Sequence, residues 1–223
     1  MTRRPTPSST PSPHTAPHKG CRLCRSPGDR GCVEYPGFGA DPAVPDDHRT
    51  LVRMLAESAR RTAAGRPLVL LGFCVGGGVA HAVAGQLTAD GEPPAGVVLI
   101  ETHDPRHPQR DERLLALIQG GAARPAEEYL ALADDTRVLA GGAYLRLFEH
   151  WHPEPMEVPA LLVRATQPTA QLAALPAGLD WRPHWPLPAD TVDVPGDHFT
   201  LLTEHADAVA AAIRHWLGGR SHG

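Results

Sequence analysis

The segment Gly72–Gly76 has the sequence Gly-Phe-Cys-Val-Gly, a G-x-C-x-G pattern with a cysteine at its centre. It follows the apolar run Leu68–Leu71 and precedes a stretch of small and apolar residues, Gly77–Leu87. This order predicts a strand buried on both faces, a sharp turn and a helix, which together expose a nucleophile at the turn. The flanking glycines let the strand and the helix approach each other closely around Cys74.

A cysteine at such a turn favours nucleophilic chemistry. A thiolate is a better nucleophile than a hydroxyl, and the positive end of a helix that begins just after Cys74 favours the thiolate. The alternative is a buried structural cysteine, because short motifs often occur without function. The preceding strand, the following helix and a histidine far downstream favour the nucleophile.

Candidate partners for the cysteine follow later strands. His198 lies in Gly-Asp-His-Phe after the predicted strand Thr191–Val194, and Glu101 directly follows the predicted strand Ala95–Ile100, with Asp104 three residues on. The order nucleophile, acid, histidine is that of α/β-hydrolases. His198 would act as general base, and Glu101 or Asp104 would orient its ring; we favour Glu101.

Other potentially reactive side chains are expected to have no catalytic role. Cys21-x-x-Cys24, with Cys32 nearby, lacks the second pair of ligands that a zinc site needs, so we expect neither a metal nor a cofactor. The remaining histidines that follow strands or loops are interpreted as structural or surface residues: His103, His107, His150, His152, His184 and His205.

The composition indicates one soluble α/β domain. The chain has 223 residues, 42% of them hydrophobic, and a net charge of -4, which does not favour nucleic-acid or anionic-membrane partners. It has no apolar run long enough to span a membrane and no apolar segment typical of a signal peptide. We therefore expect a cytoplasmic protein with reduced thiols.

The chain divides into two regions of different composition. Residues 1–30 are rich in Thr, Pro, Ser and Arg and are expected to be disordered, whereas 31–219 form the folded domain. A short strand is predicted over Gly31–Tyr35, and a helix over about Leu51–Ala64, with Asp46 or Asp47 at its beginning.

Predicted helices and strands also alternate along the second half of the chain. Residues 106–155 are predicted as a helical insertion with breaks at Gly120-Gly121 and Gly141-Gly142, either a lid or simple crossover packing. A strand at 158–163, an irregular Pro/Trp stretch at 181–186 and a final helix at 205–217 follow. This order predicts a doubly wound, mostly parallel sheet.

From Tyr35 to Leu217 the chain resembles the thioesterase domains of modular polyketide synthases and non-ribosomal peptide synthetases. The resemblance is carried by seven stretches: P-G-F-G from Pro36, L-L-G-F-C-V-G-G from Leu70, G-E-P-P-A-G-V-V-L-I-E from Gly91, D-D-T-R from Asp134, G-A-Y from Gly142, W-x-P-x-W-P from Trp181 and V-P-G-D-H-F-T-L-L-T-E-H-A from Val194. It implies a nucleophile at Cys74, a triad acid at Glu101 and a base at His198. The insertion at 106–155 then corresponds to the family's lid.

The resemblance also implies a reaction and a partner. An acyl chain would arrive as a thioester on the phosphopantetheine arm of an acyl carrier protein, transfer to the nucleophile and leave by hydrolysis, acyl transfer or cyclisation. With Cys74 the acyl-enzyme would itself be a thioester, which stays activated. The backbone N–H of Val75 would stabilise the oxyanion.

Two features depart from the family pattern. Members carry a further strand, loop and helix before Pro36-Gly37, and that loop supplies a second oxyanion donor for which this sequence offers no candidate. The family's Ser and Asp are replaced by Cys74 and Glu101. The alternative hypothesis is therefore a truncated, catalytically impaired relative that at most binds carrier protein.

Overall fold

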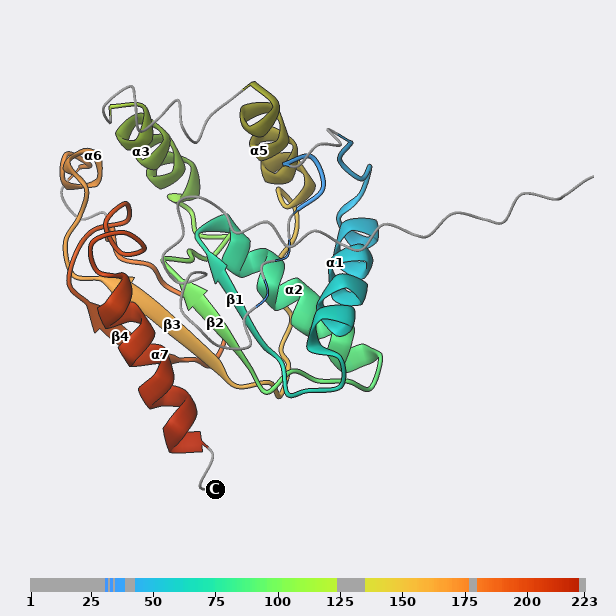
Figure 1. Ribbon diagram of the computed structural model, residues 1–223. Helices are drawn as coiled ribbons and strands as arrows, with labels where there is room; N and C mark the ends of the chain where they lie inside the picture. Colours follow the sequence, from blue (N-terminus) through green and yellow to red (C-terminus); the bar gives the residue numbers. More distant parts are fainter. Residues whose placement is uncertain are drawn as a thin grey trace, which may run out of the picture.

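The computed structural model describes residues 31, 33, 35–38, 43–123, 135–176 and 180–220. Its four strands form one sheet in the order β1-β2-β3-β4, and every neighbouring pair is parallel (Figure 1). The strands span Val69–Phe73, Gly96–Ile100, Ala160–Ala165 and Asp190–Val194. The predicted parallel α/β architecture is confirmed.

Helices cover both faces of this sheet. Every residue of β2 is buried, and its side chains alternate between the two faces: Val97 and Leu99 belong to the core beside α2 (Val75–Ala89), while Val98 and Ile100 belong to the core beside α7 (Ala206–Arg220). The alternation explains why a parallel strand needs a continuous apolar run.

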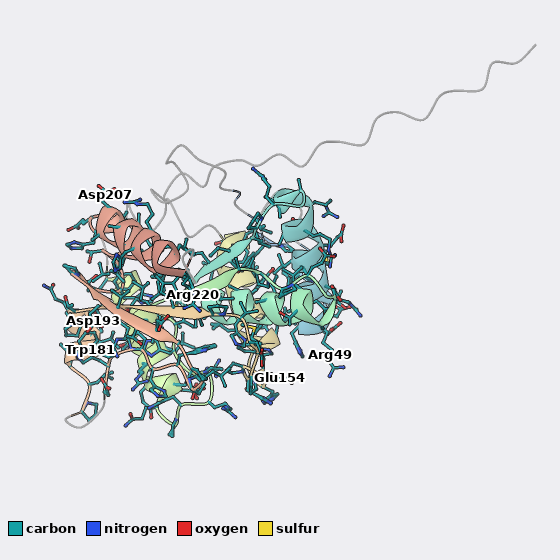
Figure 2. The ribbon with its side chains drawn as sticks, turned by 90° about the horizontal axis from the view of Figure 1, so that it is seen from below. Arg49, Glu154, Trp181, Asp193, Asp207 and Arg220 are labelled. Atoms are coloured by element: carbon teal, nitrogen blue, oxygen red, sulfur yellow. The ribbon has the colours of Figure 1, made fainter. Side chains whose placement is uncertain are left out.

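Polar contacts join the ends of α7 and β4. The carboxylate of Asp190 accepts a hydrogen bond from Trp216 Nε1 at 2.7 Å and pairs with Arg220 at 3.2 Å. Arg220 lies at the C-terminal end of α7, where Figure 2 labels it. These contacts fix the helix whose other end follows the loop that carries His198.

Helix α1 (His48–Ala63) begins where the sequence predicts. Asp47 is its N-cap, and its Oδ1 accepts a hydrogen bond from Thr50 N at 2.9 Å. The buried stripe of Leu51, Leu55 and Ala59 packs α1 against α2. Figure 1 shows α1 beside α2 on the outside of the sheet.

The predicted helical insertion contains α3 (Arg110–Ala122) and α5 (Asp135–Leu147), which lie beyond the carboxyl ends of β1 and β2 (Figure 1). The predicted break at Gly141-Gly142 is wrong, because α5 continues through both residues. Glycine lowers helix stability by only about 1 kcal/mol, which packing of the helix can offset. The predicted break at Gly120-Gly121 is also too early, since α3 ends at Ala122.

Two further predictions are wrong. Among the described residues 31, 33 and 35 there is no strand; Val33 and Tyr35 instead pack by their side chains against the core between α1, α2 and α5. The strand β1 is not buried on both faces, because it lies at the edge of the sheet that the described strands form and Leu71 is 45% exposed.

The predictions for residues 1–30 and for Cys32 lie outside the described residues. In the part of the chain that the structure describes, no helix has both the length and the apolar character that crossing a membrane requires.

Candidate active site

Cys74 occupies the turn between β1 and α2 in a strained backbone conformation. Its φ of 54° and ψ of -125° lie outside the common regions for a residue with a side chain. The backbone N–H of Cys74 donates to Ile100 O at 2.8 Å, which extends the β1–β2 ladder and holds the turn. Gly72 is required here, because a Cβ would collide with the backbone of Gly76.

Glu101 is the second strained residue of the site. It follows β2 with φ 50°, and its backbone N–H donates to Val163 O at 2.8 Å. Its side chain is 2% exposed; Oε1 accepts a hydrogen bond from Ala165 N at 2.6 Å, and Oε2 lies 3.3 Å from His198 Nδ1. One carboxylate therefore joins the ends of three strands.

The loop after β4 positions His198. Asp197 Oδ1 accepts hydrogen bonds from Phe199 N at 2.9 Å and Thr200 N at 3.0 Å, which shapes the turn around the histidine. The His198 ring is buried and lies 4.6 Å from the ring of Phe73, centroid to centroid. The imidazole is thus held by a loop on one side and by β1 on the other.

The charge of His198 depends on its two partners. Burial alone would lower the pKa of this imidazole, but the charge of Cys74 and hydrogen bonds to Cys74 and Glu101 together raise it to about 9. Since Nδ1 faces Glu101, the other ring nitrogen, Nε2, is the one left for the hydrogen bond to Cys74. The imidazole of His198 is therefore mostly protonated at neutral pH.

The structure thus brings Cys74, His198 and Glu101 together, whereas Asp104 lines the pocket and has other hydrogen-bond partners. Asp104 Oδ1 accepts a hydrogen bond from Arg106 N at 2.9 Å, and the backbone N–H of Asp104 donates to His184 O at 2.9 Å. Between the two acids that the sequence left open, the geometry favours Glu101.

Val75 is the first residue of α2, so its backbone N–H has no acceptor within the helix. It directly follows Cys74 and lies at the positive end of the helix, where a developing oxyanion is stabilised. Within the described residues we assign no second N–H to this role.

A pocket opens between the turn at Cys74 and the helices α3 and α5. Its wall is mostly apolar, with side chains from both helices and from the loop after β2. The lining residues are Cys74, Val75, Gly78, Thr102, His103, Asp104, Pro105, Arg110, Arg113, Leu114, Leu117, Leu145, Phe148 and Trp151. Cys74 therefore stands at the wall of a mostly apolar cavity that also contains charged and polar side chains.

Comparison with protein families gives one match over most of this chain. The thioesterase domain family matches residues 23–217, which include the turn at Cys74, the whole sheet and His198. The chain belongs to the thioesterase domain family.

Two polyketide synthase proteins are similar to this thioesterase domain in sequence. The spectinabilin polyketide synthase system protein NorC of Streptomyces orinoci is 38% identical over 210 residues, which are 92% of this chain and 9% of NorC. Erythronolide synthase EryA3 of Saccharopolyspora erythraea is 36% identical over 208 residues, 92% of this chain and 6% of EryA3. The chain thus spans less than a tenth of the length of these relatives.

Solved structures support the fold. The NocB thioesterase domain, crystallised as a covalent complex with a fluorophosphonate nocardicin G analogue, aligns with a TM-score of 0.59 and 23% identity. The alignment covers 82% of this chain and 80% of the crystallised NocB thioesterase domain. The thioesterase domain therefore has the α/β-hydrolase fold that the order of its elements predicts.

Sequence reasoning missed six polar or aromatic residues of the pocket wall, namely Thr102, His103, Arg110, Arg113, Phe148 and Trp151. His103 was interpreted as structural or at the surface, yet it lines the pocket of the thioesterase domain beside Cys74. Its position just past the carboxyl end of a parallel strand was the available signal, because such ends gather functional groups. Arg113 had no comparable signal, since helix α3 alone brings it to the site.

In the described part of the thioesterase domain, no group of three or more His, Cys, Asp or Glu side chains could hold a metal ion. Cys74 is a free thiol there, and Cys21, Cys24 and Cys32 are outside those residues.

Proposed function

We propose that this chain releases acyl chains from the phosphopantetheine thioester of an acyl carrier protein, in polyketide or peptide biosynthesis, through an acyl-enzyme on Cys74. The observation that carries the proposal is His198, buried between the Cys74 sulfur and the Glu101 carboxylate. Family membership and the polyketide synthase relatives support the class of substrate.

In the first step the Cys74 thiolate attacks the thioester carbonyl carbon. The carbonyl oxygen becomes an oxyanion that the N–H of Val75 stabilises. When the tetrahedral intermediate collapses, the carbon–sulfur bond to pantetheine breaks, and His198 Nε2 gives its proton to the departing thiolate. One thioester is exchanged for another, so the step is near thermoneutral and the acyl group stays activated.

In the second step a water, hydroxyl or amine attacks the Cys74 thioester. The neutral His198 takes the proton of this nucleophile at Nε2, and Glu101 stabilises the imidazolium that forms. Collapse releases an acid, ester or amide and returns Cys74 as a thiolate beside the imidazolium. The three outcomes correspond to hydrolysis, acyl transfer or cyclisation, depending on where the nucleophile originates.

We further propose that residues 31–219 act as one domain in the cytoplasm and that 106–155 form its lid. Helix α3 supplies Leu114 and Leu117 to the pocket, and α5 supplies Leu145, with Phe148 directly after it, which supports a role in covering the acyl chain. Covering the chain excludes water, which protects a thioester intermediate until the acceptor arrives.

The test has two readouts on the full chain. After a brief iodoacetamide pulse, peptide mass spectrometry should find Cys74 alkylated ahead of Cys21, Cys24 and Cys32. Incubation with an acyl-pantetheine thioester should add one acyl group, mapped to Cys74 and lost in Cys74→Ala.

Equal alkylation of all four cysteines, or acylation that persists in Cys74→Ala, would contradict the proposal. If no acyl-enzyme forms but the chain binds an acyl carrier protein in a pull-down, the impaired, binding-only relative is the better description.

A further inference from the structure

Arg113 is a buried cation in the wall of the acyl pocket. It belongs to α3, is only 2% exposed and lines the same cavity as Cys74. Its Nη2 donates to the backbone carbonyl of Asp180, but its Nε and Nη1 have no hydrogen-bond partner within the described part of the chain. Burial without full pairing lowers the pKa of Arg113, with Asp180 partly opposing.

His103 lines the same pocket and is also unsatisfied. Neither of its ring nitrogens has a partner among the described residues. Burial, followed by the charges of Arg113, His198 and His107, lowers the pKa of His103 to about 3, although Asp180 opposes this effect. At neutral pH this imidazole is uncharged and offers one donor and one acceptor.

Three other polar side chains of the pocket wall have partners within the protein, of which Arg110 donates from Nη1 to Asp111 Oδ1 at 3.5 Å. The Thr102 hydroxyl donates to Ile100 O at 3.3 Å, and the Asp104 carboxylate accepts from the backbone of Arg106. The side chains of Leu114 and Leu117 on α3 are apolar. An occupant that brings only methylene groups would therefore leave the donors of Arg113 unpaired, which is costly in a buried site.

We propose that Arg113 and His103 form a polar subsite that binds an oxygen atom on the acyl chain, so that the domain prefers oxygenated chains to plain alkanoyl chains. The proposal rests on the proposed function, because it assigns a role to the wall of the acyl pocket. Hydroxyl, ketone and carboxylate groups all supply an acceptor oxygen, and a terminal carboxylate would also neutralise the guanidinium charge.

The experiment is a competition between two acyl thioesters for Cys74 in the same reaction mixture. Octanoyl-N-acetylcysteamine is mixed with an equal amount of a 3-, 5- or 7-hydroxyoctanoyl, 7-oxooctanoyl or 7-carboxyheptanoyl thioester. Because the acyl groups differ in mass, peptide mass spectrometry of Cys74 at early times gives the ratio of the two acyl-enzymes directly. We expect at least one oxygenated chain to acylate Cys74 in preference to octanoyl. The chain that is preferred identifies the oxygen group and its position.

Arg113→Met should lower that preference by about 10- to 100-fold, the range expected when a hydrogen bond to a charged group is lost. Arg113→Lys, which keeps the charge with fewer donors, should give an intermediate preference. Arg146→Met is the matched control, because Arg146 lies exposed on the other lid helix, α5, and should leave the preference unchanged. If Arg113→Met does not fold, His103→Phe replaces it and should lower the preference in the same direction.

Failure of this inference differs from failure of the proposed function. If Cys74 is acylated equally by all chains, or if the preference is the same in wild type, Arg113→Met and His103→Phe, the proposed polar subsite is refuted. The proposed acyl-enzyme on Cys74 is then still supported. If no thioester acylates Cys74, both the proposed function and the proposed subsite are refuted.

Discussion

Replacing Glu101 with glutamine tests the coupling on which the proposed chemistry depends. Glu101 accepts two hydrogen bonds, one from Ala165 N at 2.6 Å and one on the oxygen 3.3 Å from His198 Nδ1. A glutamine side chain of the same size has only one acceptor oxygen, and its NH₂ would face a donor at the other contact. The substitution therefore removes a charge and one acceptor while it keeps the shape.

The effects of losing the acceptor and of losing the charge can each be given a magnitude. A buried donor left without an acceptor costs about 1–3 kcal/mol, so the melting temperature should fall by several degrees. Removing the carboxylate should lower the pKa of His198 from its value of about 9 by about one to three units. A His198 pKa lowered to between 8 and 6 leaves between about nine-tenths and one-tenth of the imidazole charged at pH 7, so the rate of Cys74 alkylation by iodoacetamide should fall by up to about tenfold.

The assay follows alkylation of Cys74 by mass spectrometry between pH 5 and 10. Glu101→Gln should shift the pH profile and slow the reaction at neutral pH. Glu101→Asp, which keeps the charge but loses reach, should fall between glutamine and wild type. If Asp104→Asn slows alkylation and Glu101→Gln does not, Asp104 is the acid and our reasoning is refuted.

Three further predictions concern stability, each measured by denaturant unfolding. Gly72→Ala should destabilise the domain by about 2–4 kcal/mol, because its Cβ meets the backbone of Gly76, whereas Gly85→Ala in α2, with no atom nearby, should stabilise it by up to about 1 kcal/mol. His81 is buried in the folded state, which lowers its pKa to about 4 from an unfolded value of 6.5. Its neutral form therefore costs no stability above pH 6.5, and stability is lost progressively as the pH falls from 6.5 to 4; His81→Leu should remove up to about 3 kcal/mol of that acid sensitivity. Tyr144→Phe should cost about 1 kcal/mol, because it removes the hydrogen bond to Pro36 O at 2.9 Å; an unchanged stability would contradict this.

The strands and the main helices could be predicted from the sequence because their signals are local. Asp47 caps α1, and the apolar run of β2 is buried throughout. The edge position of β1 could not be predicted, because the exposure of Leu71 depends on which strands are its neighbours. Helix α5 continues through Gly141-Gly142 because tertiary packing outweighs a small local preference.

The candidate site could be predicted where its residues follow strands in the order that the sequence shows. Cys74, Glu101 and His198 each occupy the turn or loop that follows a strand, and the topology of a parallel sheet brings such segments to one edge. Arg113 was not predictable, since its importance comes from burial and from hydrogen-bonding groups left unpaired. Those properties exist only after α3 has packed over the loop that follows β2.

The register of the sheet explains why a glutamate suits the acid position here. Phe73 pairs with Ile100, and Ile100 with Val163, so β1 ends level with β2, while β3 continues to Ala165. A carboxylate at Glu101 must therefore reach forward along β3 to accept from Ala165 N and still face the histidine beyond β4. The additional methylene of glutamate, together with its positive φ of 50°, supplies that reach. The strained backbone and the longer side chain of Glu101 thus act together to connect His198 with the end of β3.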